Sequence, residues 1–240
     1  MKKKLKKNKN SWLKIWEKKG TELKSSKIEN LINASGFDSK FGEFNEKNWK
    51  RYIRAIFKNI KIKKNAEILE YGCGAGSFLS FWYGKNYKLS GVDYSKSLIT
   101  KGKKYFPKIN FRVGESLELQ NFQSNFDLII SHSVFHYFRN YTYAKNLISN
   151  MLSKLKTTGI ICILDVPDKD MEKSFKFKLK KELGNYEYKK KYKKTNHLFY
   201  KKSFFKDIAI ENNLNIKIFK HSSKFNLNSK YRYNLILKFK

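Results

Sequence analysis

From Ala66 onward, short apolar runs alternate with segments in which apolar residues recur every three or four positions. The runs are AEILEYG, YKLSGVD, INFRVG, FDLIIS and GIICILDV, and the segments between them include GSFLSFWYG, SKSLITKGKKYF and YTYAKNLISNMLSKLK. Nearly continuous apolar strands that alternate with helices are typical of a parallel sheet buried on both faces. The pattern therefore predicts an α/β fold with right-handed crossovers from residue 66 to about residue 166.

The flanking segments follow other patterns. Helical spacing recurs in residues 11–62 and predicts an N-terminal helical cap over residues 11–65, whereas the Lys-rich residues 1–10 are expected to form a frayed basic tail. Residues 168–206 show no clear period and predict an irregular basic excursion over one end of the sheet. It leads into a helix, KSFFKDIAIENN, and then LNIKIFKHS and KYRYNLILKF alternate as two strands that are expected to pair antiparallel at the sheet edge.

Charge changes this picture less than its size suggests. The 240 residues carry a formal net charge of +33, yet residues 66–170 hold only 13 Lys and Arg against 9 Asp and Glu, so the flanks hold the excess. A polyanionic partner, such as nucleic acid or an anionic membrane surface, would explain the charge. We favour compositional drift instead, because Lys far outnumbers Arg, and bidentate recognition of phosphates and bases uses Arg.

The cysteines and the apolar segments narrow the class of protein. Cys73 and Cys162 stand far apart in apolar surroundings, which predicts neither a disulfide framework nor a zinc site, and a reducing, cytoplasmic location is expected. No apolar h-region follows the basic N-terminus, and no run of 18 apolar residues occurs, so neither a secretory signal nor a transmembrane helix is expected.

A glycine-rich loop, EYGCGAGS, follows the first apolar run. A dinucleotide fingerprint would need a third glycine where Ser77 stands, and no Gly-Lys-Ser/Thr sequence of a P-loop is present. Glu70 immediately before the loop would also repel a pyrophosphate. A ligand with a ribose, an adenine and a cationic amino-acid tail fits better, and S-adenosylmethionine is such a ligand, with Glu70 able to meet its ammonium.

Two further polar positions support this interpretation. Asp93 ends the second apolar run, where a carboxylate can accept hydrogen bonds from both ribose hydroxyls. The alternative role of Asp93 is a helix N-cap, but Ser95 can serve equally well. After the third run, Glu115 and Ser116 can meet the adenine amino group, or they can belong to a solvated turn.

Together these motifs resemble those of class I S-adenosylmethionine-dependent methyltransferases, particularly small-molecule enzymes of bacterial surface-polysaccharide clusters. The matching stretches are LEYGCGAG, GVDYS and LKTTG, the last with Thr157 and Thr158 in place of the usual Pro-Gly. The resemblance implies a doubly wound, mostly parallel seven-stranded sheet with an antiparallel last strand, in a methyltransferase domain over residues 66–240. It also implies that S-adenosylmethionine is bound by Glu70, Tyr71, Gly72, Cys73, Gly74, Asp93, Tyr94, Glu115, Ser116 and Ser131.

The stretch SHSVFHYF ends the fourth run and is expected at the carboxyl edge of the sheet, where ligands bind in open α/β folds. His136 is the first candidate for a general base and His132 the second, because histidine titrates in the useful range. Either can instead be a structural histidine. Asp165 and Asp168 end the fifth run and can touch the acceptor or cap a turn. No metal site is expected, since no third ligand stands near the two histidines.

The favoured function is methyl transfer to an oxygen or nitrogen of a small-molecule acceptor, such as a sugar or a phosphate-bearing precursor of a capsule or other polysaccharide. An Asn-Pro-Pro-Tyr type motif, which accompanies adenine and glutamine methylation, does not follow the fourth run. The alternatives are an RNA methyltransferase, motivated by the charge, and a non-catalytic module that binds cofactor or nucleic acid.

Overall fold

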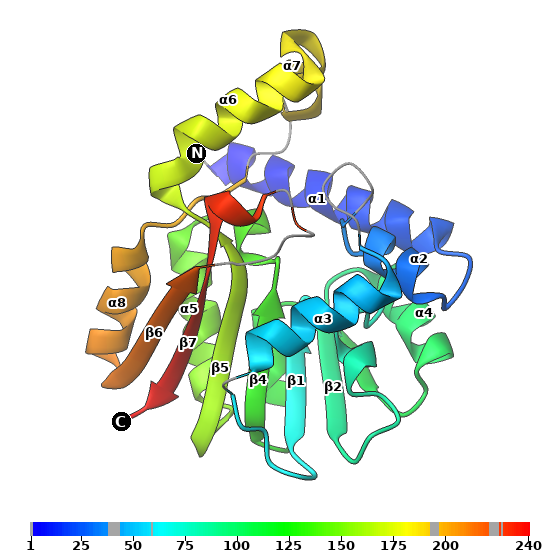
Figure 1. The fold of residues 1–240 in the computed structure, drawn as a ribbon, viewed down its shortest axis with the longest axis vertical. Helices are drawn as coiled ribbons and strands as arrows, with labels where there is room; N and C mark the ends of the chain where they lie inside the picture. The colour runs from blue at the N-terminus through cyan, green and yellow to red at the C-terminus, as the bar shows by residue number, and fades with distance from the viewer. Residues whose placement is uncertain (1, 38–43, 59, 193–196, 221–225, 227) are drawn as a thin grey trace.

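The computed structural model describes residues 2–37, 44–58, 60–192, 197–220, 226 and 228–240 (Figure 1). Within them, seven strands form one sheet in the order β3-β2-β1-β4-β5-β7-β6. The strands are β1 (Glu67–Tyr71), β2 (Lys88–Asp93), β3 (Asn110–Val113), β4 (Phe126–His132), β5 (Leu155–Pro167), β6 (Leu214–Lys220) and β7 (Arg232–Phe239). Strands β1 to β5 are parallel, and β7 pairs antiparallel with both β5 and β6. The predicted fold class and the antiparallel edge pair are confirmed.

Helices cover both faces of the sheet (Figure 1). They are α1 (Lys2–Glu22), α2 (Ile28–Ala34), α3 (Glu46–Phe57), α4 (Lys96–Tyr105), α5 (Tyr141–Leu152), α6 (Glu172–Leu183), α7 (Asn185–Tyr192) and α8 (Lys202–Glu211). Neighbouring strand residues point to opposite faces. Ile68 and Ile130 accordingly pack in the cluster that contains residues of α1 to α4, and Leu69 and Ile129 pack in the cluster that contains residues of α5 and α8. Burial on both faces explains the continuous apolar runs.

The segment GSFLSFWYG does not form the predicted helix. It contains one short 3₁₀ turn, η1 (Leu79–Phe81), between other turns. Helix α3 supplies the layer instead: the Trp49 indole donates a hydrogen bond to the Ser77 carbonyl at 3.0 Å, and Phe57 packs edge-on against Trp82. The aromatic residues of this segment therefore belong to an interface with a helix that precedes the sheet in the chain.

Two flanking segments are more regular than predicted. Residues 2–10, expected as a frayed tail, are the first part of α1, in keeping with the good helix propensity of Lys. The excursion over residues 168–206 contains α6 and α7, joined at Gly184, whose φ is +77°. Phe175 and Leu179 of α6 are buried with Phe199 and Tyr231, so a small core that joins segments distant in the chain stabilises this helix.

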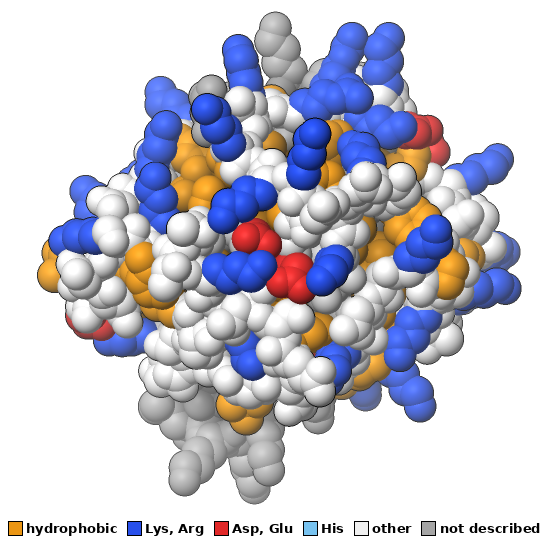
Figure 2. Space-filling view, turned by 90° about the horizontal axis from the view of Figure 1, so that it is seen from below, with side chains coloured by type: hydrophobic (Ala, Val, Ile, Leu, Met, Phe, Trp, Pro, Cys, Tyr) orange, Lys and Arg blue, Asp and Glu red, His pale blue; other side chains and the backbone are white. Residues whose placement is uncertain are grey.

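The edge of the sheet at which β1 to β5 begin carries scattered charge. Figure 2 shows Lys and Arg side chains around this face, with few acidic groups among them. The acidic groups are engaged: Lys156 Nζ lies 2.9 Å from Glu67 Oε2 and 2.8 Å from Asp127 Oδ2. None of the described helices combines the length and the apolar character that crossing a membrane requires.

Candidate functional site

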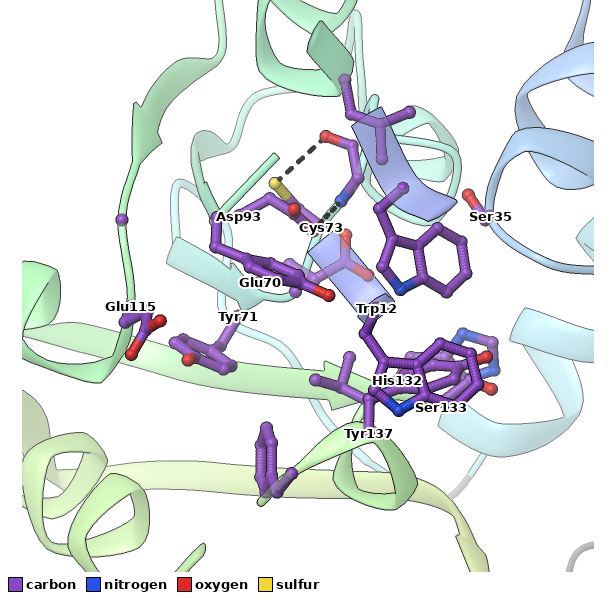
Figure 3. A pocket seen from close by; sticks show the side chains of 18 of the residues that line it. Trp12, Ser35, Glu70, Tyr71, Cys73, Asp93, Glu115, His132, Ser133 and Tyr137 are labelled. Atoms are coloured by element: carbon purple, nitrogen blue, oxygen red, sulfur yellow. Dashed lines mark hydrogen bonds between the residues drawn. The ribbon is translucent and has the colours of Figure 1, made fainter. Parts of the chain in front are cut away.

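A cavity lies where β1, β2 and β4 end, which is the edge predicted to bind ligands. Glu115 and Tyr71 lie at one end of it in Figure 3, and Trp12, His132 and Tyr137 lie at the other. Glu70 and Asp93 also line the cavity. The two ends therefore differ chemically, because Glu115 contributes a carboxylate to one and His132 contributes an imidazole to the other.

The glycine loop forms one wall. Gly72 has a φ of +76°, and a Cβ there would come within 2.3 Å of Val134, so both the backbone conformation and the packing require glycine. The amides of Gly72 and Cys73 both donate to the Val92 carbonyl, at 2.7 and 3.1 Å. These bonds tie the turn to the end of β2 and leave Gly72, Cys73 and Gly74 lining the cavity.

Asp93 lines the cavity from the end of β2. Its Oδ2 accepts a hydrogen bond from the Gly74 amide at 2.9 Å, and its Oδ1 accepts one from the Ser95 amide at 2.8 Å. Burial raises the pKa of Asp93 to about 6, against the lowering effect of these bonds. Ser95 caps α4 by accepting a bond from Leu98, as the sequence indicated, so Asp93 is not needed as a cap.

Glu70 is buried in the cavity wall, with only 2% of its surface exposed. Burial, and then the nearby charge of Asp93, raise the pKa of Glu70 well above its ordinary value, although the Leu79 amide donates a hydrogen bond to it. Its Oε2 has no hydrogen-bond partner among the described residues. A buried carboxylate with an unused oxygen is costly, which points to a cationic or hydrogen-bond-donating ligand.

The other predicted cofactor residues divide into two groups. Tyr71, Tyr94 and Glu115 line the cavity, whereas Ser116 and Ser131 are buried beside it without lining it. Sequence reasoning missed the lining residues Arg139 and Tyr143. The Arg139 guanidinium stacks 4.4 Å from the Tyr143 ring and lies 4.0 Å from Glu115 Oε2. The stretch HYFRNYTY contains both, and its density of polar aromatic residues is the signal that could have found them.

The two candidate bases lie in different environments. His132 lines the cavity, stacks on Phe37, and has its Nε2 2.8 Å from the Tyr52 hydroxyl. His136 is 2% exposed and is not among the lining residues. Its Nδ1 lies 3.2 Å from Arg232 Nη1 and must accept that bond, because a guanidinium only donates. Burial, followed by the charge of Arg232, lowers the pKa of His136 well below its ordinary value. The geometry therefore favours His132.

Near the ends of β4 and β5, two residues adopt left-handed backbone conformations that are rare outside glycine. Ser133 has a φ of +58° and Asp165 a φ of +59°. The Ser133 hydroxyl, which lines the cavity, donates to Asp165 Oδ2 at 2.7 Å, and the Asp165 amide donates to Asn234 Oδ1 at 2.8 Å. Arg232 Nη1 lies 3.8 Å from Asp165 Oδ2. Strand β7 thus supports the ends of β4 and β5.

Helix α1 covers the end of the cavity that contains His132. Trp12 and Trp16 line it, and the buried Trp12 Nε1 has no hydrogen-bond partner among the described residues. The Trp12 ring stacks on His197 at 5.4 Å and meets Tyr137 edge-on at 4.6 Å. Trp12 and Trp16 thus belong both to the lining of the cavity and to the core cluster that includes α1 to α4.

Helix α1 is anchored at the start of α4. The Glu17 carboxylate accepts hydrogen bonds from the Lys96 amide at 2.6 Å and the Ser97 amide at 3.1 Å, and the Ser97 hydroxyl donates to the Glu17 carbonyl at 2.8 Å. Partial burial acts to raise the pKa of Glu17, but the bonds from Ser97 and Lys96 outweigh it, so the pKa lies below its ordinary value. An anion at a helix N-terminus is favourable, so this contact fixes α1 over the cavity.

Residues 62–221 match the family described as a methyltransferase domain. Among curated proteins, the chain is 24% identical over 128 residues to the non-reducing polyketide synthase ausA of Emericella nidulans, a match that covers 48% of this chain and 5% of the synthase. It is 31% identical over 146 residues to the ribosomal RNA small subunit methyltransferase C of Pseudoalteromonas translucida, covering 55% of this chain and 42% of that protein. The chain thus spans a small part of the first curated relatives it matches.

Solved structures share the fold. The PH0226 protein of Pyrococcus horikoshii superposes with a TM-score of 0.62 at 18% identity, covering 87% of this chain and 99% of that one. The magnesium protoporphyrin IX methyltransferase of Synechocystis PCC 6803 with bound SAH superposes with a TM-score of 0.54 at 16% identity, covering 88% and 95%. At these identities the likeness concerns the architecture, including the seven-stranded sheet.

Proposed function

The chain belongs to the methyltransferase-domain family, and from this premise we propose that it transfers a methyl group from S-adenosylmethionine to an oxygen or nitrogen of a small-molecule acceptor. The predicted enzyme class and class I fold are confirmed by the family match and by the fold shared with S-adenosylmethionine-dependent methyltransferases. The methyl donor is accordingly S-adenosylmethionine, which supplies a methyl group on a sulfonium centre. The acceptor and the roles of single residues are what we propose.

The residues of the cavity fit this donor. Glu70 Oε2, which has no hydrogen-bond partner among the described residues, would accept from the ammonium of the methionine part. Asp93 would accept from the ribose hydroxyls with the lone pairs that the amides of Gly74 and Ser95 leave unused. Tyr71, Tyr94 and Glu115 would surround the adenine end. The cavity thus places carboxylates where the ligand is cationic or donates hydrogen bonds.

The enclosure of the cavity by α1 carries the proposal of a small acceptor. Trp12, Trp16, Phe37 and Tyr137 line the end that contains His132, and α1 is bonded down onto α4. A covered, largely aromatic pocket with a few polar groups is typical of small-molecule sites. A sugar or a phosphate-bearing precursor of a surface polysaccharide is the acceptor that the sequence resemblance favours.

His132 would act as the general base for an acceptor hydroxyl or a protonated amine. The imidazole would take the proton of a hydroxyl acceptor as its oxygen gains the methyl group, or would first take the proton of a protonated amine so that its nitrogen has a lone pair for the attack, and Tyr52, 2.8 Å from Nε2, would fix the ring orientation. Ser133, held by Asp165, would orient the acceptor from the same strand end. Most of the remaining rate enhancement would come from alignment of acceptor and methyl group.

The test is methyl transfer from labelled S-adenosylmethionine to a fractionated extract. We expect calorimetry to detect S-adenosylhomocysteine binding and the label to enter small molecules that pass a filter. If no small molecule is labelled while calorimetry still shows binding, the acceptor class is wrong. If no binding occurs, the donor site is wrong.

An RNA acceptor is the second candidate, favoured by the net charge of +33 and by the partial match to a ribosomal RNA methyltransferase. It predicts that the label enters RNA and that RNA affinity falls steeply with salt. A non-catalytic module would instead tolerate His132→Ala and His136→Ala without loss of function.

A further inference from the structure

Helices α6 and α7 meet at Gly184, and the two together are called the α6–α7 hairpin. This hairpin carries the two most exposed aromatic side chains among the described residues. Phe177 is 72% exposed and Tyr186 is 76% exposed. Soluble proteins expose single apolar residues routinely, but two large aromatic side chains on one small projecting element form a feature that favours a partner. The hairpin projects beyond the edge of the sheet where the cavity lies (Figure 1).

The helical geometry turns these rings outward among lysines. Phe175 and Leu179 face the small core with Phe199 and Tyr231, so Phe177, two positions from each, points away from it. Lys173 and Lys181 stand four residues before and after Phe177 and share its exposed face. On α7, the exposed Lys189 and Lys190 follow Tyr186 by three and four residues.

The acidic residues of the hairpin do not neutralise this face, because each is engaged with a lysine. Glu172 pairs with Lys169 and Lys176, Glu182 with Lys178, and Glu187 with Lys190. Lys173, Lys181 and Lys189 have no ion pair with any residue that the structure describes. Their charge is therefore available to an anionic partner.

We propose that the α6–α7 hairpin docks the protein on an anionic membrane surface. Aromatic side chains flanked by Lys are suited to the boundary between lipid headgroups and acyl chains. Each lysine near an anionic membrane surface raises the affinity of a protein for that surface roughly fivefold. Single-stranded nucleic acid is bound in basic grooves, and base recognition uses Arg. This hairpin projects outward and contains no Arg, so the lipid surface is the better match.

Docking would place the cavity next to the lipid surface. The next described residues after α7 include His197, which stacks on Trp12 of the cavity cover, and Leu198, whose amide donates to the His136 carbonyl at 2.9 Å. The docked helices are therefore followed in the chain by residues that pack against the cover of the cavity. The docking itself does not depend on which molecule is methylated, so its test is independent of the proposed function.

The test measures binding of the full chain to vesicles of phosphatidylcholine with one third phosphatidylglycerol, by sedimentation. Because the whole chain is basic, matched variants decide. We expect Phe177→Ala/Tyr186→Ala to weaken binding at least fivefold, and the control Leu117→Ala/Ile210→Ala, which removes side chains 74% and 79% exposed elsewhere, to change it less than twofold.

The lysines are tested in the same way. Lys173→Gln/Lys181→Gln should weaken vesicle binding severalfold more than Lys103→Gln/Lys104→Gln, which removes two exposed lysines from α4. Equal losses in both pairs would show that only net charge matters, and would overturn the proposal. It would also be overturned if the hairpin variants lost affinity for transfer RNA but kept their affinity for vesicles. Circular dichroism and S-adenosylhomocysteine binding should be unchanged in every variant.

Discussion

At the scale of single residues, Glu70 combines a cost in stability with a use in binding. Its folded pKa is raised above the ordinary 4.5, so ionisation of Glu70 does not lower the free energy of unfolding at a pH below 4.5. As the pH rises through the folded pKa, the buried carboxyl lowers that free energy progressively. Glu70→Gln keeps an oxygen for the Leu79 amide and removes the charge. We expect it to raise the thermal midpoint at pH 8 by about 2–4 °C, to leave it unchanged at pH 4, and to weaken S-adenosylhomocysteine binding about tenfold or more.

Scanning fluorimetry at both pH values and calorimetry check this prediction. Glu211→Gln on α8, an exposed carboxylate 2.6 Å from Lys145, is the control that removes the same charge without burial. A Glu70→Gln protein that is less stable at pH 8 than at pH 4, relative to the unmodified chain, would contradict the assignment of a raised pKa.

The two histidines should separate catalysis from stability. His132→Ala is expected to lower kcat about a hundredfold or more, because a general base contributes roughly 10²–10⁴, while S-adenosylhomocysteine affinity changes little. His136→Ala removes the acceptor of a buried Arg232 hydrogen bond and should cost about 1–3 kcal/mol of unfolding free energy. Its kcat per folded molecule should stay within a few-fold.

Single-turnover transfer to an identified acceptor and urea denaturation measure the two effects. Loss of kcat in the folded His136→Ala protein with full activity of His132→Ala would restore the order that the sequence favoured. The order differs because the sequence places both histidines at or just after the end of β4, and only the packing of Arg232 from β7 shows which one is withdrawn from the cavity.

At the scale of elements, the contact between α1 and α4 controls the cover of the cavity. Glu17→Gln keeps the size of the side chain but removes its charge from the α4 N-terminus, and we expect S-adenosylhomocysteine affinity to fall about 2- to 30-fold, as for loss of a helix cap. The pKa of Glu17 is lowered, so the contact should persist above pH 4.5 and weaken as the pH falls through the folded pKa.

Calorimetry and limited proteolysis of the α1 segment provide the measurement. Glu22→Gln is the matched control, because Glu22 lies on the same helix and its Oε1 is 3.6 Å from Nζ of the exposed Lys18. This variant should bind S-adenosylhomocysteine as the unmodified chain does. Equal effects of the two substitutions would mean that charge on α1, rather than its anchoring, sets the affinity.

The elements that the sequence predicted correctly owe their signal to neighbours nearby in the chain. β1 to β5 are apolar because both faces are buried, and Asp93 is recognisable from its place after β2. The sequence wrongly predicted a helix at GSFLSFWYG and did not predict α6. The first segment depends on contacts with α3 and the second on contacts with Tyr231, and both partners are distant in the chain. The same holds for the cavity: Trp12 lines it from α1 and Tyr52 of α3 contacts its lining residue His132, and no local pattern distinguishes the two from core residues.

At the scale of the whole molecule, 53 basic residues face 20 acidic ones, so the balance between self-repulsion and ion pairing can be tested with salt. Ion pairs such as Lys156 with Glu67 and Asp127 would be weakened by salt, whereas repulsion between unpaired lysines would be relieved. Since lysines greatly outnumber their possible partners, we expect repulsion to dominate. Raising NaCl from about 0.01 M to about 0.1 M shortens the Debye length from about 30 Å to about 10 Å and should raise the thermal midpoint by several degrees.

Removal of lysines that have no ion pair with any described residue should reproduce the effect of salt. Lys103→Gln/Lys104→Gln is expected to raise the midpoint at low salt and to reduce its rise with NaCl, whereas Lys156→Gln, which breaks the group at the start of β1, β4 and β5, should lower it. A midpoint that falls with added NaCl would mean that ion pairs outweigh repulsion. The excess of lysines would then not destabilise the fold, and no further interaction would be needed to offset their repulsion.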